Sequence, residues 1–483
     1  MNLKYQSLIG VFWTFLGTVG GGIVSFVLTM LLARLLSPSD YGLLELLMVF
    51  TILSAVFVDC GFSQAIIKDK NASNTDLSSV FYFNLAISIT IYIVLFLSSP
   101  LIADFFSDKR LLQLSRFVFL VVIFDSMTII QNANYAKNMQ FRPQSIATIL
   151  AMSFAGIVAV VLAFKGFGVW ALAVNMVLYS FFKMLFYWVQ SKWFPSFEFS
   201  IKSIKKYFSF GVNLLLQGLL DKFVSNLESI MIGRYYTKSE LGNFSQSRKL
   251  DSYIAQTTTS VIQKVSYPAL SQLNTDDSLK SGYRKILSIT MFFMIPLMSF
   301  CVFFADNVII AFFGNNWVNA VPYFRLWCLC GLLVSFYQIF INLFLIKNKT
   351  RQLLKVSIFR QVIRVVAIFL LIKLSVLHLL VGITLVTLMS CIIYVYVGGR
   401  LINYSLKEVF SDIWFTIVVT FLSLLTTFVL TYNLENLGTV CQLLIQSAIT
   451  VSLYVCFMFF SKNRTFIYIL NLVKSLKNKE SER

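Results

Sequence analysis

Charged residues are scarce in this chain of 483 residues: they make up 13% of the sequence, while hydrophobic residues make up 58%. Soluble domains carry roughly 25% charged and about 45–50% apolar residues. Because a single soluble core stops growing near ~250–300 residues, a water-soluble fold could not bury this much apolar surface. The composition excludes a soluble enzyme and a disordered chain. It leaves an integral membrane protein whose apolar runs, about 20 residues long and without barrel-like alternation, predict helices.

Catalytic and metal-binding patterns are also lacking. The chain has one histidine, His378, so a Ser/His/Asp constellation could form only around that residue. No segment matches the phosphate-binding pattern G-x-x-x-x-G-K-[ST], and no metal-ligand spacing occurs. We therefore expect no enzymatic activity, no cofactor and no metal site.

Acidic residues are few: 21 Asp and Glu stand against 40 Lys and Arg, a formal charge of +19. Such an excess suggests nucleic acid in a soluble protein, but no basic, aromatic-interleaved soluble segment exists here to bind it. Cytoplasmic loops of membrane proteins collect Lys and Arg, and their distribution predicts that both termini lie in the cytoplasm. Bilayer lipids, and not nucleic acid, are the expected surroundings.

The apolar runs predict an all-α polytopic membrane protein with about fourteen transmembrane helices. The predicted spans lie near 8–36, 42–63, 79–103, 111–135, 145–165, 168–191, 207–232, 240–268, 284–305, 318–346, 352–373, 377–399, 411–432 and 437–461.

An internal repeat is visible at offsets of 200 to 210. Residues 33–42 (ARLLSPSDYG) recur as 233–242 (GRYYTKSELG), and Phe-Phe at 105–106 recurs at 312–313. The repeat predicts two parallel six-helix lobes, 1–195 and 205–400, related by an axis along the membrane normal. Two further helices in 405–462 and a cationic amphipathic cytoplasmic tail, 463–483, follow. The alternative is a duplicated bundle that packs symmetrically and transports nothing.

Polar residues follow one face of the predicted span 207–232. They step by three or four positions and are Asn213, Gln217, Asp221, Ser225 and Glu228. This stripe indicates a helix that lines a cavity, and the alternative is a polar seam against a neighbouring helix. The next span, 240–268, contains Arg248, Lys249 and Lys264 and is barely apolar enough to insert alone. It also indicates an aqueous cavity, unless it is an interfacial helix that does not cross.

Cationic residues inside other spans point to an anionic substrate. Arg360 and Arg364 lie one turn apart on one helix face, and Lys183 lies within span 168–191. Arg binds phosphate well because its planar fork reaches two oxygens at once. Arg116 and Arg325 match each other in the repeat, and for them helix capping or snorkelling to headgroups is an equal alternative.

Four acids within spans are candidates for ion coupling: Asp59, Asp125, Asp221 and Glu228. Burial raises the pKa of a carboxylate, so each could bind a proton or sodium ion. Each could equally neutralise a nearby Arg or Lys.

Short motifs in a specific order resemble the bacterial polysaccharide exporters of the Wzx type. The matching segments, which fall within residues 1 to about 400, are 12–15 (FWTF), 33–42, 61–65 (GFSQA), 80–84 (VFYFN), 166–170 (GFGVW), 208–211 (FSFG) and 313–317 (FGNNW). These exporters belong to the multidrug/oligosaccharidyl-lipid/polysaccharide superfamily, and the nearest branch includes the colanic acid and teichuronic acid exporters.

The resemblance implies a flippase of the bacterial cytoplasmic (inner) membrane. Its substrate would be an oligosaccharide on undecaprenyl diphosphate, moved to the outer leaflet for lipopolysaccharide, capsule or exopolysaccharide biosynthesis. Two six-helix lobes would alternate access around a central cavity, next to the polysaccharide polymerase machinery.

Three other readings stay open at this point. The first is an ion-coupled multidrug exporter of the same superfamily, which would bind cationic drugs. The second is a membrane polymerase, which would need a large outer loop that the short gaps between spans do not provide. The third is a scaffold that transports nothing, which should tolerate loss of the polar stripe.

Overall fold

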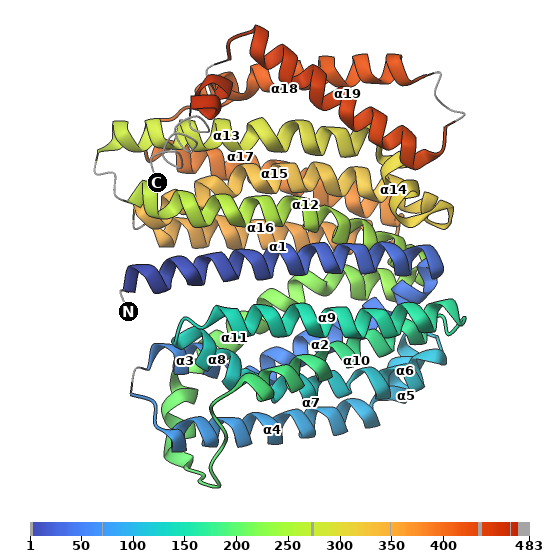
Figure 1. Ribbon diagram of the computed structural model, residues 1–483, viewed down its shortest axis with the longest axis vertical. Helices are drawn as coiled ribbons and strands as arrows, with labels where there is room; N and C mark the ends of the chain where they lie inside the picture. Colours follow the sequence, from blue (N-terminus) through green and yellow to red (C-terminus); the bar gives the residue numbers. More distant parts are fainter. Residues whose placement is uncertain are drawn as a thin grey trace. The chain divides into compact units, whose positions relative to one another are not determined.

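The computed structural model describes residues 3–69, 71–271, 275–347, 349–432, 437–463 and 465–471, and every regular element in these ranges is a helix (Figure 1). Cα packing divides the chain into two compact units, Met1–Ser245 and Gln246–Arg483. The all-α fold class predicted from the sequence is confirmed. The predicted lobe boundaries stay a prediction, because compact packing does not test a repeat.

In the described residues, the first unit contains ten helices followed by the long helix α11. They are α1 (Leu3–Leu35), α2 (Pro38–Asp59), α3 (Phe62–Lys68), α4 (Asn74–Leu97), α5 (Ser99–Phe105), α6 (Arg110–Val118), α7 (Leu120–Ser126), α8 (Ile129–Lys137), α9 (Phe141–Phe164), α10 (Val169–Gln190) and α11 (Ile201–Tyr235). α12 (Lys238–Ser271) begins in this unit and continues into the second.

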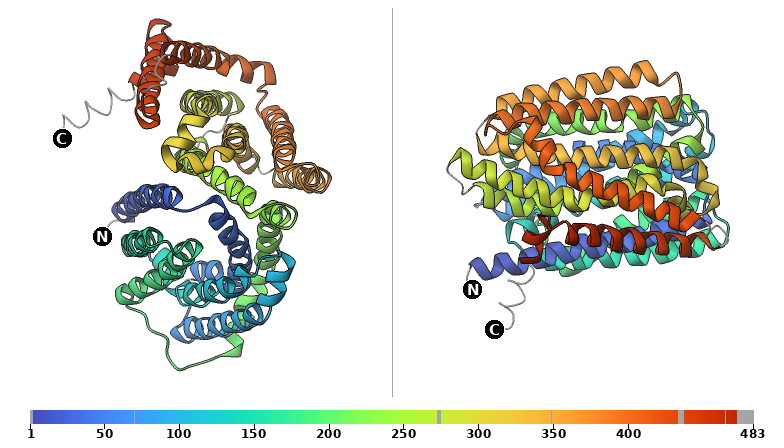
Figure 2. Two further views of the ribbon diagram at one scale, coloured as in Figure 1. Left: turned by 90° about the vertical axis from the view of Figure 1, so that its right-hand side faces the viewer. Right: turned by 90° about the horizontal axis from the view of Figure 1, so that it is seen from above.

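The described part of the second unit contains seven labelled α-helices after the boundary and one 3₁₀ segment. They are α13 (Asp276–Phe303), α14 (Ala305–Phe313), η1 (Asn315–Ala320), α15 (Val321–Ile346), α16 (Thr350–Leu371), α17 (Val376–Arg400), α18 (Leu406–Thr431) and α19 (Thr439–Phe460). Within each unit the long helices run roughly parallel or antiparallel to one another (Figure 2).

Eleven helical segments of the described chain are long and apolar enough to cross a membrane. α11, α12 and α16 are also long, at 35, 34 and 22 residues, but they carry more charge. These three correspond to the predicted spans 207–232, 240–268 and 352–373. The chain is therefore a multi-pass membrane protein, while the count of fourteen spans stays a prediction.

The predicted span 111–135 is not one continuous helix. It is broken into α6, α7 and α8. The hydroxyls of Ser115, Ser126 and Thr128 each donate to the carbonyl three residues earlier, at 3.2, 2.7 and 2.8 Å. Such bonds compete with the helical backbone ladder and bend it. The hydropathy of the segment gives no sign of these breaks, because hydroxyls that bond locally fit an apolar run.

Small side chains bring α1, α9 and α10 together in the first unit. The alanines of α9 that recur every four residues, Ala147, Ala151, Ala155 and Ala159, are fully buried. Without bulk on this stripe, helix backbones approach closely, as is typical of packing in membranes. In the second unit a cluster that includes Tyr283, Phe340 and Tyr394 joins α13, α15 and α17.

The motif that repeats in the sequence forms the same local structure twice. Ser37 and Asp40 cap the start of α2 reciprocally, with N–H to side-chain oxygen distances of 3.0 and 3.3 Å. Thr237 and Glu240 do the same at α12, at 3.2 and 3.2 Å. Each pair satisfies two backbone donors that a helix start leaves without partners. The matched Ser/Thr and Asp/Glu positions are therefore a repeated capping box.

Candidate substrate-binding residues

The helix that carries Arg360 and Arg364 has two different faces. One side of α16 is apolar and exposed, with Leu354, Ile358, Val362 and Val366 each between 49 and 59% accessible. The opposite side carries Ser357, Arg360, Gln361 and Arg364, which are all half-buried. The apolar side suits lipid, and the two arginines lie on the side turned toward protein.

Arg360 is held by a pair of stacked tyrosines. Its Nη1 donates to the Tyr337 hydroxyl at 2.7 Å, and the Tyr337 ring stacks on Tyr394 at 5.0 Å. The Tyr394 hydroxyl lies 2.9 Å from the Ser357 hydroxyl, which closes the cluster between α15, α16 and α17. Arg360 Nε is buried and has no hydrogen-bond partner in the described structure. The guanidinium is therefore fixed in place while it keeps a donor for an anion.

Arg364 lies close enough to the same tyrosine cluster to interact with it electrostatically. Its positive charge interacts with the side chains of Tyr337 and Cys330 on α15. Two arginines on one face of one helix, of which Arg360 is bonded to a tyrosine hydroxyl, form a cationic surface in this unit. Low dielectric strengthens the attraction of such a surface for anions.

Asp251 is an acid near this cluster that the sequence analysis did not assign a role. Its side chain is on α12 and is 7% exposed, and its Oδ1 has no hydrogen-bond partner in the described structure. A Cβ on Gly331 of α15 would lie 2.1 Å from that oxygen, so the glycine makes the space that the carboxylate occupies. A carboxylate buried in this way suits a proton or cation site.

The polar stripe on α11 passes from an exposed to a buried environment. Gln217, Asp221 and Ser225 are exposed, whereas Glu228 is fully buried. A charged side chain exposed within a membrane span needs contact with water or a polar partner, which favours a wet surface along this part of α11. The side chain of Asn213 lies outside the described residues.

The residue after Glu228 contacts a second acid, which the sequence analysis did not include. Ser229 donates to Glu45 of α2 at 3.0 Å, so the end of α11 and the start of α2 share polar contacts. Glu45 is half-buried. The repeat alignment could not identify it, because Ser245 occupies the matching position in the second copy.

Lys183 and Asp125 lie together in the first unit. Their charged atoms are 3.8 Å apart, between α10 and α7, and the amine lies 6.0 and 5.9 Å from the rings of Tyr179 and Tyr187. Asp59 accepts from the backbone N–H of Ser63 at 3.2 Å, at the junction of α2 and α3. The roles of these residues in substrate or ion binding stay predictions.

The two arginines matched by the repeat make local contacts near helix ends. Arg116 Nε donates to Ser99 Oγ at 3.0 Å, and its guanidinium lies 4.5 Å from the Phe96 ring centre. Arg325 forms an ion pair with Asp306. The partners in these contacts are side chains, so both the capping or snorkelling alternative and a role in substrate binding stay predictions.

The two described cations of the predicted span 240–268 differ in solvent exposure. Arg248 is half-buried and Lys249 is exposed. The side chain of Lys264 lies outside the described residues. The structure thus brings Arg360 and Arg364 together, and describes Arg116, Arg325 and Lys183 in separate local contacts.

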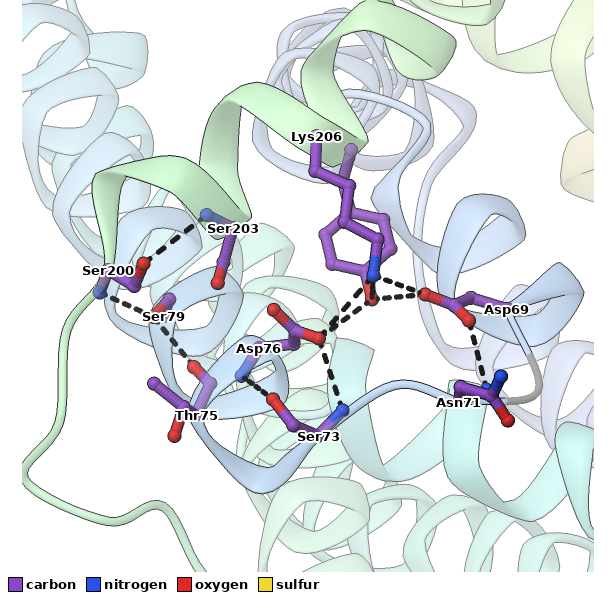
Figure 3. A network of polar contacts seen from close by, with 10 residues as sticks. Asp69, Asn71, Ser73, Thr75, Asp76, Ser79, Ser200, Ser203 and Lys206 are labelled. Atoms are coloured by element: carbon purple, nitrogen blue, oxygen red, sulfur yellow. Dashed lines mark hydrogen bonds and ion pairs between the residues drawn. The ribbon is translucent and has the colours of Figure 1, made fainter.

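A polar network fixes the start of α11 to the segment between α3 and α4 (Figure 3). Lys206 Nζ lies 2.6 Å from Asp69 and 3.6 Å from Asp76, and the backbone N–H of Ser200 donates to Ser79 Oγ at 2.8 Å. The hydrogen bond from Lys206, with those from Tyr207 and the Asn71 backbone, lowers the pKa of Asp69 to about 2. The same contact raises the pKa of Lys206 above its usual range.

Residues 31–322 match the model of a family described as polysaccharide biosynthesis protein. The chain belongs to this family. The resemblance to bacterial polysaccharide exporters is confirmed.

Two curated relatives are similar to this chain in sequence. The chain is 24% identical to the teichuronic acid biosynthesis protein TuaB of Bacillus subtilis over 337 residues, which covers 69% of each chain. It is 23% identical to the lipopolysaccharide biosynthesis protein WzxC of Escherichia coli over 378 residues, covering 76% of this chain and 75% of the relative.

Solved structures show the same fold. The lipid II flippase MurJ in an inward closed conformation aligns with a TM-score of 0.74 and 15% identity, over 94% of this chain and 99% of that one. An inward-facing multidrug resistance transporter of the MATE family aligns with a TM-score of 0.57 and 16% identity, over 79% and 94%. At these identities the likeness is one of fold alone.

Proposed function

We propose that this polysaccharide biosynthesis protein moves undecaprenyl-diphosphate-linked oligosaccharide units across the cytoplasmic membrane. It acts by alternating access of two lobes and supplies the biosynthesis of a surface polysaccharide. The observation that carries the proposal is the placement of Arg360 and Arg364 on the protein-facing side of α16, with Arg360 bonded to Tyr337. Membership of the family supports the same pathway.

The physical task explains why cations would be needed. A sugar chain and a diphosphate cannot cross hydrocarbon unaided, because their polar groups would lose water without gaining partners. The polyprenyl tail, in contrast, stays stable in lipid. Guanidinium groups that bind two phosphate oxygens at once would hold the diphosphate while the tail remains in the bilayer.

The remaining assignments belong to the same proposal. The substrate would contact Arg360, Arg364, Arg248, Lys249, Lys264, Arg116, Arg325, Lys183, Asn213 and Gln217. Ion coupling would use one or more of Asp221, Glu228, Asp59 and Asp125, to which we add Asp251. Both termini would lie in the cytoplasm, and the polysaccharide polymerase machinery would receive the product.

Purified full-length protein in liposomes tests the function. Lipid-linked oligosaccharide is placed in the inner leaflet, and a lectin outside the vesicle measures its arrival in the outer leaflet. We expect the protein to accelerate arrival over protein-free vesicles, and to have no such effect on a phospholipid of similar charge. Equal rates with and without protein would contradict the proposal.

An ion-coupled multidrug exporter is the second candidate, and the buried carboxylates of Asp251 and Glu228 favour it, since cationic drugs need anionic partners. It predicts that the protein lowers cellular accumulation of ethidium and that Arg360→Ala with Arg364→Ala remains active. Ethidium export without lipid transport would replace the first candidate by the second.

A further inference from the structure

A cavity of about 640 Å³ lies within the first unit, at one end of the helices. Its wall includes two indoles, two cations and five amides, and the residues used below, from α1, α8, α9 and the segment after α10, are Trp13, Trp193, Arg142, Lys192, Gln131 and Asn134. With the N-terminus in the cytoplasm, all these segments meet at the cytoplasmic end of their spans. None of these residues is among those predicted from the sequence to bind substrate.

The walls of the cavity are fixed by contacts between distant segments. Ser145 Oγ donates to the Trp13 carbonyl at 2.9 Å, which ties α1 to α9, and the Arg142 guanidinium lies 5.2 Å from the Trp13 ring centre. On the other side, Trp193 Nε1 donates to Asn74 Oδ1 at 2.6 Å. The Trp193 indole is therefore held by a hydrogen bond, and the Trp13 indole lies against the Arg142 guanidinium on a helix that is tied to α9.

The buried amide of Gln131 indicates that a polar ligand binds in this cavity. Its side chain is 1% exposed and lines the cavity, yet neither its Oε1 nor its Nε2 has a hydrogen-bond partner in the described structure. Buried polar groups nearly always have partners, and such an exception calls for a group that binds there. The amide is available to one donor and one acceptor at the same time.

We propose that this cavity binds a sugar residue of the lipid-linked oligosaccharide before transport, a claim that rests on the proposed function. Sugar hydroxyls both donate and accept, as the amides of Gln131 and Asn134 do. Indole faces give apolar surface to the flat C–H side of a pyranose. The volume falls within the range of about 300–1,000 Å³ that small-molecule sites occupy.

The two cations of the wall define the class of sugar further. Arg142 and Lys192 are both exposed and lie beside the amides. They suit a carboxylate or phosphate substituent on the sugar, or the diphosphate linker itself. An amide carries no charge and therefore adds little to binding of the diphosphate linker. Substitution of the amides should thus weaken binding of the sugar and leave binding of the linker unchanged.

Binding to the purified full-length protein tests the proposal with two probes. One is undecaprenyl diphosphate carrying the oligosaccharide of the producing strain, and the other is undecaprenyl diphosphate without sugar. Gln131→Leu and Asn134→Leu should each raise the Kd for the sugar-bearing lipid about tenfold and leave the Kd for the sugarless lipid unchanged. The matched control is Gln113→Leu, an exposed glutamine of α6 outside the cavity wall, which should change neither value.

Each other outcome overturns the proposal. If the variants bind both lipids more weakly and to the same extent, the cavity recognises the diphosphate linker or the lipid and not the sugar. If the variants bind both lipids as tightly as the wild type does, the cavity has no role in substrate binding. A wild-type protein that binds neither lipid would contradict the proposed function itself. Thermal unfolding shows whether each variant is folded. If Gln131→Leu does not fold, Asn134→Leu alone tests the proposal, because Asn134 is only half-buried and its substitution disturbs the fold less.

Discussion

Gly42 and Gly242 face each other where the first turns of α2 and α12 meet, within Met1–Ser245. A Cβ on Gly42 would lie 1.8 Å from the Lys238 carbonyl oxygen, and a Cβ on Gly242 would lie 1.8 Å from the Pro38 carbonyl oxygen. Gly42 and Gly242 are 200 positions apart, as are Pro38 and Lys238, so the contact is reciprocal about a local two-fold relation. The repeated motif therefore does more than cap two helices, because its last residue allows the two copies to touch.

Any side chain at either glycine should disturb this contact. Gly42→Ala and Gly242→Ala would each force two backbones apart, at a cost of about 1–3 kcal/mol in unfolding free energy. Thermal unfolding in detergent measures the effect. Gly22→Ala is the matched control, because nothing lies within 4 Å of its Cβ position. Equal stability of the Gly42 and Gly22 variants would show that the backbones are not in contact.

The Asp69–Lys206 contact should give the stability a defined pH dependence. The pKa of Asp69 falls from 3.8 to about 2 in the folded state, so its stabilisation is complete above pH 3.8 and is lost as the pH falls. The pKa of Lys206 is raised, so its stabilisation is present below its ordinary pKa of 10.5 and is lost as the pH rises through the folded value. The contact should therefore contribute its full stabilisation to the folded state between pH 3.8 and pH 10.5.

Lys206→Met tests this dependence. Because the lysine side chain is 52% exposed, the loss should be at most about 1 kcal/mol. The difference in Tm from wild type should be constant between about pH 5 and 9 and should narrow below about pH 4. Lys205→Met, at the exposed neighbouring position, should show no such window. A pH-independent difference would mean that the lysine acts through packing alone.

Lys183 and Asp125 allow structural and transport roles to be separated. Lys183→Met should lower stability by about 1 kcal/mol, because it leaves a partly buried carboxylate without its cation. Lys183→Met combined with Asp125→Leu should recover that stability, and the double-mutant cycle gives the coupling energy. If the double variant is stable but transports nothing, these residues act on substrate or ion. Full transport would give the pair a structural role only.

Patterns within one helix predicted the structure well. The four-residue spacing of Arg360 and Arg364 placed them on one face, and α16 turns that face away from its exposed apolar side. The capping residues Ser37 and Thr237 were visible as a repeat, and both cap helices. Such features depend only on helix geometry and neighbouring residues, so one sequence is enough to find them.

Features that depend on distant segments were missed. The space for Asp251 comes from Gly331, which lies 80 positions away and whose helix position cannot be inferred from spacing. Gln131 was read as part of one continuous span, 111–135, whereas hydroxyl contacts break that segment and α8 contributes the amide to a cavity wall. Local periodicity carries no information about which helices meet.

The central claim is that Arg360 and Arg364 hold the anionic linker of the substrate. The most direct measurement is the rate of lipid-linked oligosaccharide arrival in the outer leaflet of liposomes that contain Arg360→Ala with Arg364→Ala. Arg351→Ala, at an exposed position on the same helix, is the control. We predict that the double variant loses transport by about 100-fold or more while it still folds and inserts, since each charged contact contributes about 1.5–3 kcal/mol. A wild-type rate in the double variant would contradict the account.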